Sequence, residues 1–345
     1  MSTQDPQSSL RTSLGIPLRF ERICLEKVWG GRALEEVPGI HLEAEGPVGE
    51  TWELVDRTDN NSVVRDGPFA GRELRDLMAT DRESLLGESA LNGEGRFPVL
   101  IKYLSASQPL SIQVHPDDRT ARNLGAGDCG KTESWFILSA EPGSLVYLGL
   151  RDGVDPADFA NAARGAGIVD MLQPWPVKPG QFVHVPAGTL HAIGAGVTLV
   201  EVQQNSDLTY RLFDWGRCGL DGNPRKIHAR EGLLSIRYDQ LTEGPQDPEL
   251  TGDGDGGDNR SAHLVQTDCY DLEIHEVGSH LEVSMAGHAH ALILVEGNAR
   301  LWVDGEDEPW TFDPGDTWLV PAAVGTYRIE NCEGAAKILV VRIRG

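Results

Sequence analysis

The chain has 345 residues, too many for one small hydrophobic core, and a prior of about 100–200 residues per domain suggests two or three structural units. It carries 30 Lys and Arg residues against 53 Asp and Glu residues, which gives a net charge of −23. This balance disfavours a broad surface for nucleic acid or for an anionic membrane, because phosphate-rich partners require clustered basic residues. A small anion can still bind where a local basic pocket exists.

The N-terminal sequence MSTQDPQSSLRTSLG lacks the apolar core of a signal peptide. No apolar run approaches the roughly 20 residues that a membrane-spanning helix requires. The five cysteines are scattered along the chain without a CxxC pair, which fits reduced thiols better than a disulfide framework or zinc held by thiolates. We therefore expect a cytoplasmic protein.

The first two-thirds of the sequence predict one domain that contains most of the chemistry. Residues 1–16 are polar and predict a disordered tail, and the domain follows over residues 17–240. Most of it is typical of short strands and tight turns, above all the stretch 176–216. Apolar residues at helical spacing predict helical segments near residues 70–92 and 154–172.

The last third of the sequence predicts a linker and a second β domain. Residues 241–261 are acidic and rich in Gly and Asp, which indicates a linker. Residues 262–345 return to short strands with regular turns, typical of an all-β sandwich or barrel. The segment PGQFVHVPAG, which begins at Pro179, is repeated as PGDTWLVPAA from Pro314. We interpret the two segments as copies of one β-unit.

Polar residues that could bind a ligand or take part in catalysis lie close together in the sequence of the first domain. In SIQVHP, a strand places Ser111, Gln113 and His115 on one face, because alternate residues of a strand point the same way. Lys131 and Glu133 share a face for the same reason. An apolar surface flanks the first group, so these polar side chains are not arranged as an ordinary exposed strand requires.

A second histidine completes a candidate metal site. His191 follows a turn marked by proline and glycine, from which a side chain can project into the mouth of a barrel. Two imidazoles with oxygen ligands from Gln113 and Glu133 suit Zn²⁺, and also Mn²⁺, Fe²⁺ or Co²⁺. Such a mixed set of ligands leaves room for water or substrate, as a catalytic site requires.

The same segments carry the motifs of a known family. GQFVHVPAGTLH matches the cupin pattern G-x5-P-x-G-x2-H, at Gly180, Pro186, Gly188 and His191. Further motifs are Q-x-H-P at residues 113–116, K-x-E at 131–133, Glu201 with Arg211, W-G at 29–30 and G-E-x-W at 49–52. In this order they resemble type I mannose-6-phosphate isomerases, also called phosphomannose isomerases, within the cupin superfamily. The resemblance covers about residues 17–217, and the last third resembles only a degenerate second cupin barrel.

The resemblance implies a mostly β protein with two cupin-type jelly-roll barrels and small helical insertions around the first. It implies a metal-dependent isomerase that interconverts mannose 6-phosphate and fructose 6-phosphate through an enediol, with one zinc ion per chain as the usual metal. The implied metal ligands are Gln113, His115, Glu133 and His191. A sugar phosphate is the expected partner, without nucleic acid or membrane, and the family suggests a monomer.

The catalytic roles follow from the chemistry of proton transfer. A positioned base must take the carbon-bound proton, and the sequence leaves Glu201 and Lys131 open as candidates. Arg211 supplies a permanent positive charge for the enediolate or the phosphate, because guanidinium suits anionic oxygens. The substrate-binding candidates are Ser111, Lys131, Trp29, Glu50 and Arg211.

Other interpretations remain open at this stage. The protein could isomerise a related free or phosphorylated aldose, act as an Fe²⁺-dependent cupin oxygenase, or bind sugars without catalysis, because cupin folds host many functions. Arg211 could simply pair with Asp214. A second metal at His280, His288 and His290 is less favoured, because Thr326 stands in the second repeat where the first has its later histidine.

Overall fold

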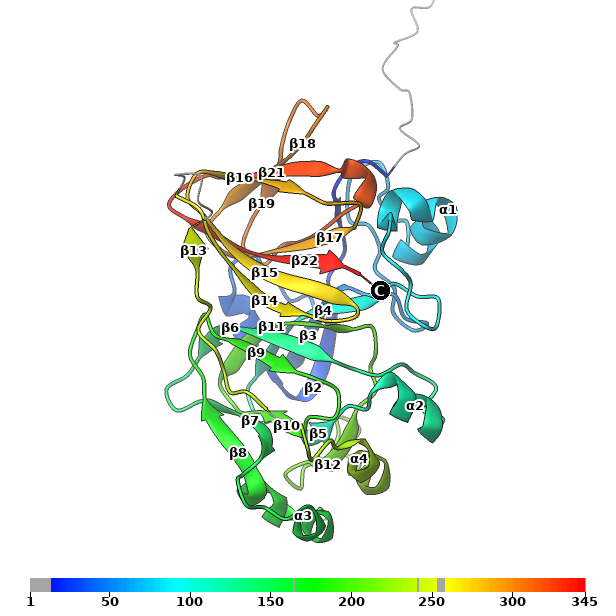
Figure 1. The fold of residues 1–345 in the computed structure, drawn as a ribbon, viewed down its shortest axis with the longest axis vertical. Helices are drawn as coiled ribbons and strands as arrows, with labels where there is room; N and C mark the ends of the chain where they lie inside the picture. Colours follow the sequence, from blue (N-terminus) through cyan, green and yellow to red (C-terminus); the bar gives the residue numbers. More distant parts are fainter. Residues whose placement is uncertain (1–13, 164, 241, 253–257, 345) are drawn as a thin grey trace, which may run out of the picture.

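The computed structural model describes residues 14–163, 165–240, 242–252 and 258–344. Over these ranges the chain is mostly β, with antiparallel sheets of six, five, seven and four strands. Figure 1 shows the sheets as successive layers along the long axis of the molecule. None of the described helices is long and apolar enough to cross a membrane. The expected mostly β fold is confirmed.

Two sheets come from the first two-thirds of the chain. The six-stranded sheet has the order β2-β3-β4-β11-β6-β9, formed by Ile23–Gly31, Val48–Leu54, Val99–Ala106, Val197–Gln204, Glu133–Ala140 and Phe182–Val185. The five-stranded sheet has the order β12-β5-β10-β7-β8, formed by Tyr210–Phe213, Ile112–Val114, His191–Ile193, Leu145–Leu150 and Leu172–Pro176. Trp135 and Leu199 of the first sheet pack in one core with Leu148 and Ile193 of the second.

The other two sheets come mainly from the last third. The seven-stranded sheet has the order β1-β20-β17-β22-β15-β14-β13, formed by Leu18–Arg19, Thr317–Val320, His290–Glu296, Ala336–Ile343, Tyr270–Val277, Arg260–Gln266 and Thr251–Gly252. The four-stranded sheet has the order β16-β21-β18-β19, formed by His280–Ser284, Thr326–Asn331, Ala299–Val303 and Trp310–Phe312. A core of aliphatic and aromatic side chains lies between them.

Strand β22 shows how the layers are joined. Its alternate residues Ile338 and Val340 join the core shared with the four-stranded sheet. Leu339 and Val341 point the other way, into a core that also contains side chains of the six-stranded sheet. The two central sheets are therefore covered on both faces, which explains why β4 is buried along its whole length and reads as a near-continuous apolar run.

The first described residues join the seven-stranded sheet and the core beneath it. Leu14, which the sequence placed in a disordered tail, is 1% exposed and packs in the central core. Strand β1 then pairs with β20, with Leu18 opposite Leu319. A short apolar pattern next to a polar tail gave no sign of a partner strand so distant in the sequence.

The helices are short and lie outside the sheets (Figure 1). Helix α1 spans Leu74–Leu86, α3 spans Pro156–Ala162, and the 3-10 helix η2 spans Ala166–Met171. They lie inside the two helical segments that the sequence predicts. Helices α2 (Asp118–Leu124) and α4 (Ala229–Ser235) were not predicted from the sequence. Two further 3-10 helices are η1 (Ala33–Glu36) and η3 (Ala322–Val324).

The predicted linker is partly seated on the sheets. Residues 253–257, its most Gly- and Asp-rich part, lie outside the described residues. Before them, Gln246 exchanges backbone hydrogen bonds of 2.8 and 2.9 Å with Phe182 of β9. Strand β13 then pairs with β14 at the edge of the seven-stranded sheet. Backbone pairing therefore holds much of this acidic stretch against the two sheet systems.

Candidate functional site

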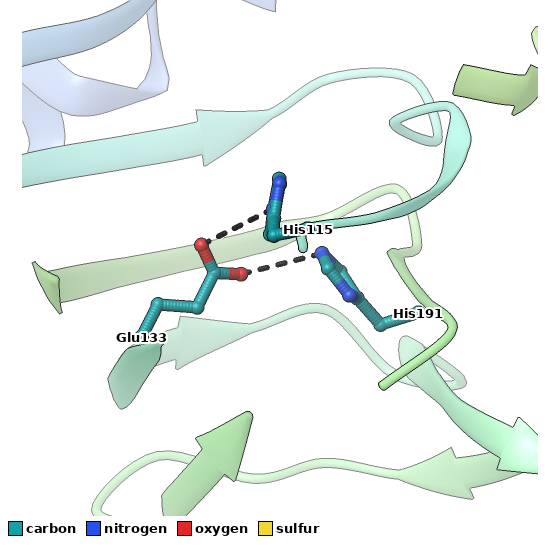
Figure 2. A group of neighbouring side chains, drawn as sticks. All are labelled: His115, Glu133 and His191. Carbon is teal, nitrogen blue, oxygen red and sulfur yellow. Dashed lines mark ion pairs between the residues drawn. The ribbon is translucent and has the colours of Figure 1, made fainter. Parts of the chain in front are cut away.

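Two histidines and a glutamate converge between the five- and six-stranded sheets. The ligand atoms of His115, Glu133 and His191 all lie within 4.8 Å of one another, and Figure 2 shows both rings facing the carboxylate. The His191 Nε2 atom is 3.3 Å from Glu133 Oε1, and the His115 Nε2 atom is 3.4 Å from Glu133 Oε2. Each side chain is at most 2% exposed. Among the described residues this is the one group of three such ligands.

The strands bring these residues together from separate parts of the sequence. His115 directly follows β5, His191 begins β10, and β5 and β10 are neighbours, with His191 opposite Gln113. Glu133 begins β6 in the facing sheet. The turn before His191 needs glycine, because Gly188 has φ of +91° and donates a 2.7 Å hydrogen bond to the carbonyl of His115.

Both imidazoles are held in the tautomer that a metal requires. The Nδ1–H of His115 donates to the carbonyl of Leu208 at 2.8 Å, and that of His191 donates to the carbonyl of Thr189 at 2.9 Å. The two Nε2 lone pairs therefore face the carboxylate. The buried His115 Nε2 has no hydrogen-bond partner among the described residues. Such an orphaned acceptor is what a metal-ligating imidazole presents.

The charges favour the forms that bind a metal. Burial, and then the ammonium of Lys131, lower the pKa of His115 well below its usual range, and burial also lowers the pKa of His191. Burial alone would raise the pKa of Glu133, but Lys131 and His191 lower it below its ordinary value. The Nζ atom of Lys131 lies 2.9 Å from Glu133 Oε2. The site thus presents two neutral imidazoles and one carboxylate at neutral pH.

Gln113 lies against this group, and its amide nitrogen rather than its amide oxygen faces His191. The Gln113 Nε2 atom is 3.2 Å from His191 Nε2, and its Oε1 accepts a 2.9 Å hydrogen bond from the Ser111 hydroxyl. A half-turn of the amide would exchange oxygen and nitrogen and place the oxygen beside the imidazole.

A cleft of about 220 Å³ opens beside this group, and Glu133 and Gln113 belong to its lining. Its lining includes every remaining candidate from the sequence, namely Trp29, Glu50, Ser111, Lys131, Glu201 and Arg211. It also includes residues that the sequence analysis missed, namely Lys27, Lys102, Asp207, Thr209 and Arg225. A larger cavity of about 560 Å³ lies elsewhere, against β7, β8 and the segment after α4, and touches none of the candidates.

One wall of the cleft is a row of alternating charges across the six-stranded sheet. The Lys102 Nζ lies 3.0 Å from Glu201 Oε1 and 3.8 Å from Glu50 Oε2, and Lys27 Nζ lies 3.4 Å from Glu50 Oε1. Burial opposes the charge on Lys102, but Glu201 and Glu50 raise its pKa. Burial likewise opposes the charge on Glu50, but Lys27 and Lys102 lower its pKa to about 2. Glu50 and Lys102 therefore stay charged although both are buried.

Each carboxylate of this row also accepts a hydrogen bond from a tryptophan. The indole N–H of Trp52 donates to Glu50 at 2.9 Å, and that of Trp135 donates to Glu201 at 3.1 Å. Trp29 is buried and packs in the core below the cleft. The rigid indoles hold the two carboxylates at defined positions in the wall.

The opposite side of the cleft carries a cation without a counter-ion. Within the described residues, no carboxylate lies at ion-pair distance from Arg211. Asp214, its expected partner, instead pairs with Arg217 at 2.8 Å and with Arg225 at 3.2 Å. Burial and then Arg225 lower the pKa of Arg211 to about 10. An unpaired, partly buried guanidinium is a ready position for an anionic group.

The histidines of the last third form no comparable group. The buried His290 is hydrogen-bonded through Nδ1 to the Tyr327 hydroxyl at 3.0 Å, and His288 lies 3.3 Å from the Ser89 hydroxyl. His280 is exposed at the start of β16. No metal-ligand group of three includes them among the described residues.

The chain is similar to several known proteins. The family model for the catalytic domain of type I phosphomannose isomerase matches residues 18–132. Mannose-6-phosphate isomerase ManA of Bacillus subtilis is 31% identical over 329 residues, which are 91% of this chain and 96% of that protein. A mannose-6-phosphate isomerase of Streptococcus mutans is 36% identical over 217 residues, 63% of this chain and 66% of that protein.

Solved structures extend the similarity to the fold. The crystal structure of the mannose 6-phosphate isomerase from Bacillus subtilis has a TM-score of 0.84 and 28% identity, and the match covers 95% of this chain and 99% of that one. The apo form of the enzyme from Salmonella typhimurium has a TM-score of 0.73 at 19% identity, which shows a shared fold. Because a relative 31% identical aligns over nearly the full length of both chains, this chain belongs to the type I mannose-6-phosphate isomerase family.

Proposed function

We propose that this chain is a metal-dependent isomerase that interconverts mannose 6-phosphate and fructose 6-phosphate. The observation that carries the proposal is the buried His115–Glu133–His191 group, whose Glu133 lines a cleft together with many charged residues. The cleft supplies what an acidic chain needs to admit a sugar phosphate, since Lys27, Arg211 and other cations line it. Family membership gives the substrate class.

The metal ligands are His115, Glu133 and His191, with Gln113 as the fourth through its amide oxygen. Zinc is the metal that we propose, because two imidazoles and a carboxylate suit it and leave a position for substrate. When bound, a divalent metal supplies Lewis-acid stabilisation for an oxyanion that develops on the sugar. The orphaned Nε2 of His115 supports this assignment.

The residues around the metal site then take separate roles in proton transfer and in sugar binding. In the open-chain aldose a base takes the proton from C2, the C1=C2 bond forms, and negative charge moves to O1. O1 then takes up a proton and the O2 hydroxyl gives one up, the C2=O2 bond forms as the C1=C2 bond is lost, and a proton delivered to C1 completes the ketose. We assign the base to Glu201, because Lys131 is ion-paired with Glu133 and an ammonium has no lone pair. Lys131 and Ser111 then bind hydroxyl groups.

Arg211 is the residue that we assign to the anionic part of the reaction. Its guanidinium lines the cleft without a carboxylate partner among the described residues. It can therefore pair with the phosphate or with the enediolate at no cost of breaking an ion pair. Trp29 and Glu50 complete the sugar-binding wall.

The four sheets suggest how the chain is organised. We propose two cupin-type barrels, one from the six- and five-stranded sheets and one from the seven- and four-stranded sheets. The proposed division is residues 17–240 and 262–345, with a structural second barrel, although β1 and β13 lie outside the second range and join its seven-stranded sheet. A monomer in the cytoplasm remains our expectation.

The test is turnover of mannose 6-phosphate to fructose 6-phosphate by protein stripped with a chelator and reloaded with Zn²⁺, Mn²⁺, Co²⁺ or Fe²⁺ in turn. We expect isomerisation to disappear on stripping and to return with zinc. A folded, metal-loaded protein that isomerises no sugar phosphate would refute the proposal. Free aldoses would then be tried first, followed by oxygen consumption with Fe²⁺ and by sugar binding without turnover.

A further inference from the structure

A buried ion pair outside the cleft connects three loops around the metal site. Arg57 lies just after β3, and Asp128 lies between α2 and β6. Their contact is bidentate, at 2.8 Å from Nη2 to Oδ2 and 3.3 Å from Nη1 to Oδ1, and the side chains are only 13% and 10% exposed. Neither residue lines the cleft, and the proposed reaction assigns neither a role.

Asp128 holds two backbone amides as well as the guanidinium. Its Oδ1 accepts from the N–H of Cys129 at 3.0 Å, and its Oδ2 accepts from the N–H of Asp207 at 3.1 Å. Asp207 belongs to the loop between β11 and β12. Arg57 fixes the same loop from the other side, because its Nη1 donates to the carbonyl of Asn205 at 3.3 Å. The ion pair thus clamps residues 205–207 against the segment that leads into β6.

The clamped loop ends at the group that orients a proposed metal ligand. The Ser206 hydroxyl donates to the carbonyl of Cys129 at 2.8 Å and accepts from the N–H of Leu208 at 3.2 Å. The carbonyl of Leu208 then accepts the Nδ1–H of His115 at 2.8 Å. A short series of hydrogen bonds therefore runs from the ion pair to the imidazole.

We propose that the Arg57–Asp128 pair is a positioning element of the metal site, which sets metal affinity by fixing the Leu208 carbonyl and, through it, the tautomer and ring orientation of His115. The inference rests on the proposed metal site. Partners that hold the far nitrogen of a metal-bound histidine usually contribute about 10–100-fold to metal affinity. A loop carbonyl performs this task only if the loop itself is held, and here the ion pair holds it.

The test compares metal affinity with fold stability. Asp128→Asn keeps the shape of the side chain but removes its charge and one acceptor. We expect it to weaken zinc binding about 10–100-fold in competition with a chromophoric chelator. Turnover should fall at limiting zinc and largely recover at excess zinc. Arg57→Lys keeps the charge but loses the bidentate fork, so its affinity should lie between those of Asp128→Asn and the unmodified protein.

A second buried ion pair provides the control. Arg22 Nε lies 2.7 Å from Glu53 Oε1, with the side chains 18% and 5% exposed, and Arg22 also donates to the carbonyl of Gly315 on the seven-stranded sheet side. Arg22→Met should lower the urea midpoint and leave zinc affinity unchanged. If Arg22→Met weakens zinc binding as much as Asp128→Asn does, the effect is general destabilisation and the inference is wrong.

Two further outcomes keep the inference separate from the proposed function. A folded Asp128→Asn protein with unchanged zinc affinity overturns the positioning role, even if the unmodified protein is an isomerase. If Asp128→Asn does not fold, Ser206→Ala tests the same series of bonds by removing one hydroxyl, and unchanged affinity there overturns the inference. An unmodified protein that binds none of Zn²⁺, Mn²⁺, Co²⁺ or Fe²⁺ overturns the proposed function itself.

Discussion

Lys102 is the residue on which the buried row of charges depends most visibly. Its ammonium lies 3.0 Å from Glu201, 3.8 Å from Glu50 and 5.5 Å from the centre of the Trp52 ring, and the side chain is 3% exposed. Lys102→Met keeps the length of the side chain and removes the cation. Two buried carboxylates then remain, with Lys27 as the nearest cation to Glu50.

The size of the effect follows from Glu50. Burial would raise its pKa, but Lys27 and Lys102 lower it from an ordinary value near 4.5 to about 2. This difference corresponds to roughly 3 kcal/mol at about 1.4 kcal/mol per pKa unit, of which Lys102 supplies a part. Breaking a buried ion pair from one side typically costs about 3–5 kcal/mol, because a charge remains without its partner. We expect Lys102→Met to lose about 3 kcal/mol of unfolding free energy at pH 7.

The loss should depend on pH. A carboxylate whose pKa is lowered on folding stabilises the protein fully above its unfolded pKa and loses that contribution as the pH falls through the folded pKa. Without Lys102 the pKa of Glu50 rises, so the variant takes up its proton at a higher pH than the unmodified protein. The difference in stability should therefore be smaller at pH 4 than at pH 7.

Urea unfolding of chelator-treated protein at both pH values measures this difference. Lys178→Met is the matched control, because Lys178 Nζ is also 3.0 Å from a carboxylate, that of Asp247, but the two side chains are 62% and 64% exposed. Its loss should stay under about 1 kcal/mol. A Lys102→Met loss no larger than this control, or equal losses at pH 4 and pH 7, would refute the reasoning.

Three further predictions concern the cleft and the metal site. His191→Ala should lose both bound metal and turnover, whereas His184→Ala, outside the site, should keep both. Elemental analysis measures the bound metal. Full metal occupancy of His191→Ala would contradict the ligand assignment. Arg211→Ala should retain metal but lose turnover of mannose 6-phosphate by about 100-fold or more, and normal turnover would remove its assigned role. Because burial lowers the pKa of His115 and His191, zinc affinity should persist below the ordinary histidine pKa of about 6.5, and a loss centred near pH 6.5 would argue against neutral buried ligands.

The sequence can place His115 and His191 in one candidate site because both sit in short motifs with fixed local geometry. His115 lies at the end of a strand that places alternate residues together, and His191 follows a glycine with positive φ. Both features are local, so they can be interpreted without knowing which strands pair. The grouping of Glu133 with these histidines, by contrast, rested on ligand chemistry and on the family pattern rather than on local geometry.

Lys102 was missed although the sequence carried a signal. A lysine in the apolar strand VLIKYLSA must either reach solvent or find buried partners, and the partners lie on strands far away in the sequence. Lys27 and Arg225 gave no signal at all, because an isolated basic residue in a turn-rich segment is ordinarily solvated. The Arg57–Asp128 pair could not be predicted either, because it joins loops that only the fold brings together.

The pairing of β1 with β20 bears on how the protein can be made in the cell. Leu18 leaves the ribosome early, but its partner Leu319 is synthesised about 300 residues later. Growing chains fold from the N-terminal end, so the nascent first half must wait with its outer sheet face uncovered. Strand pairs so distant in sequence also close slowly, because the entropy of loop closure precedes the contact. We therefore expect truncated chains that end before β20 to be captured by chaperones rather than to accumulate as a free catalytic half.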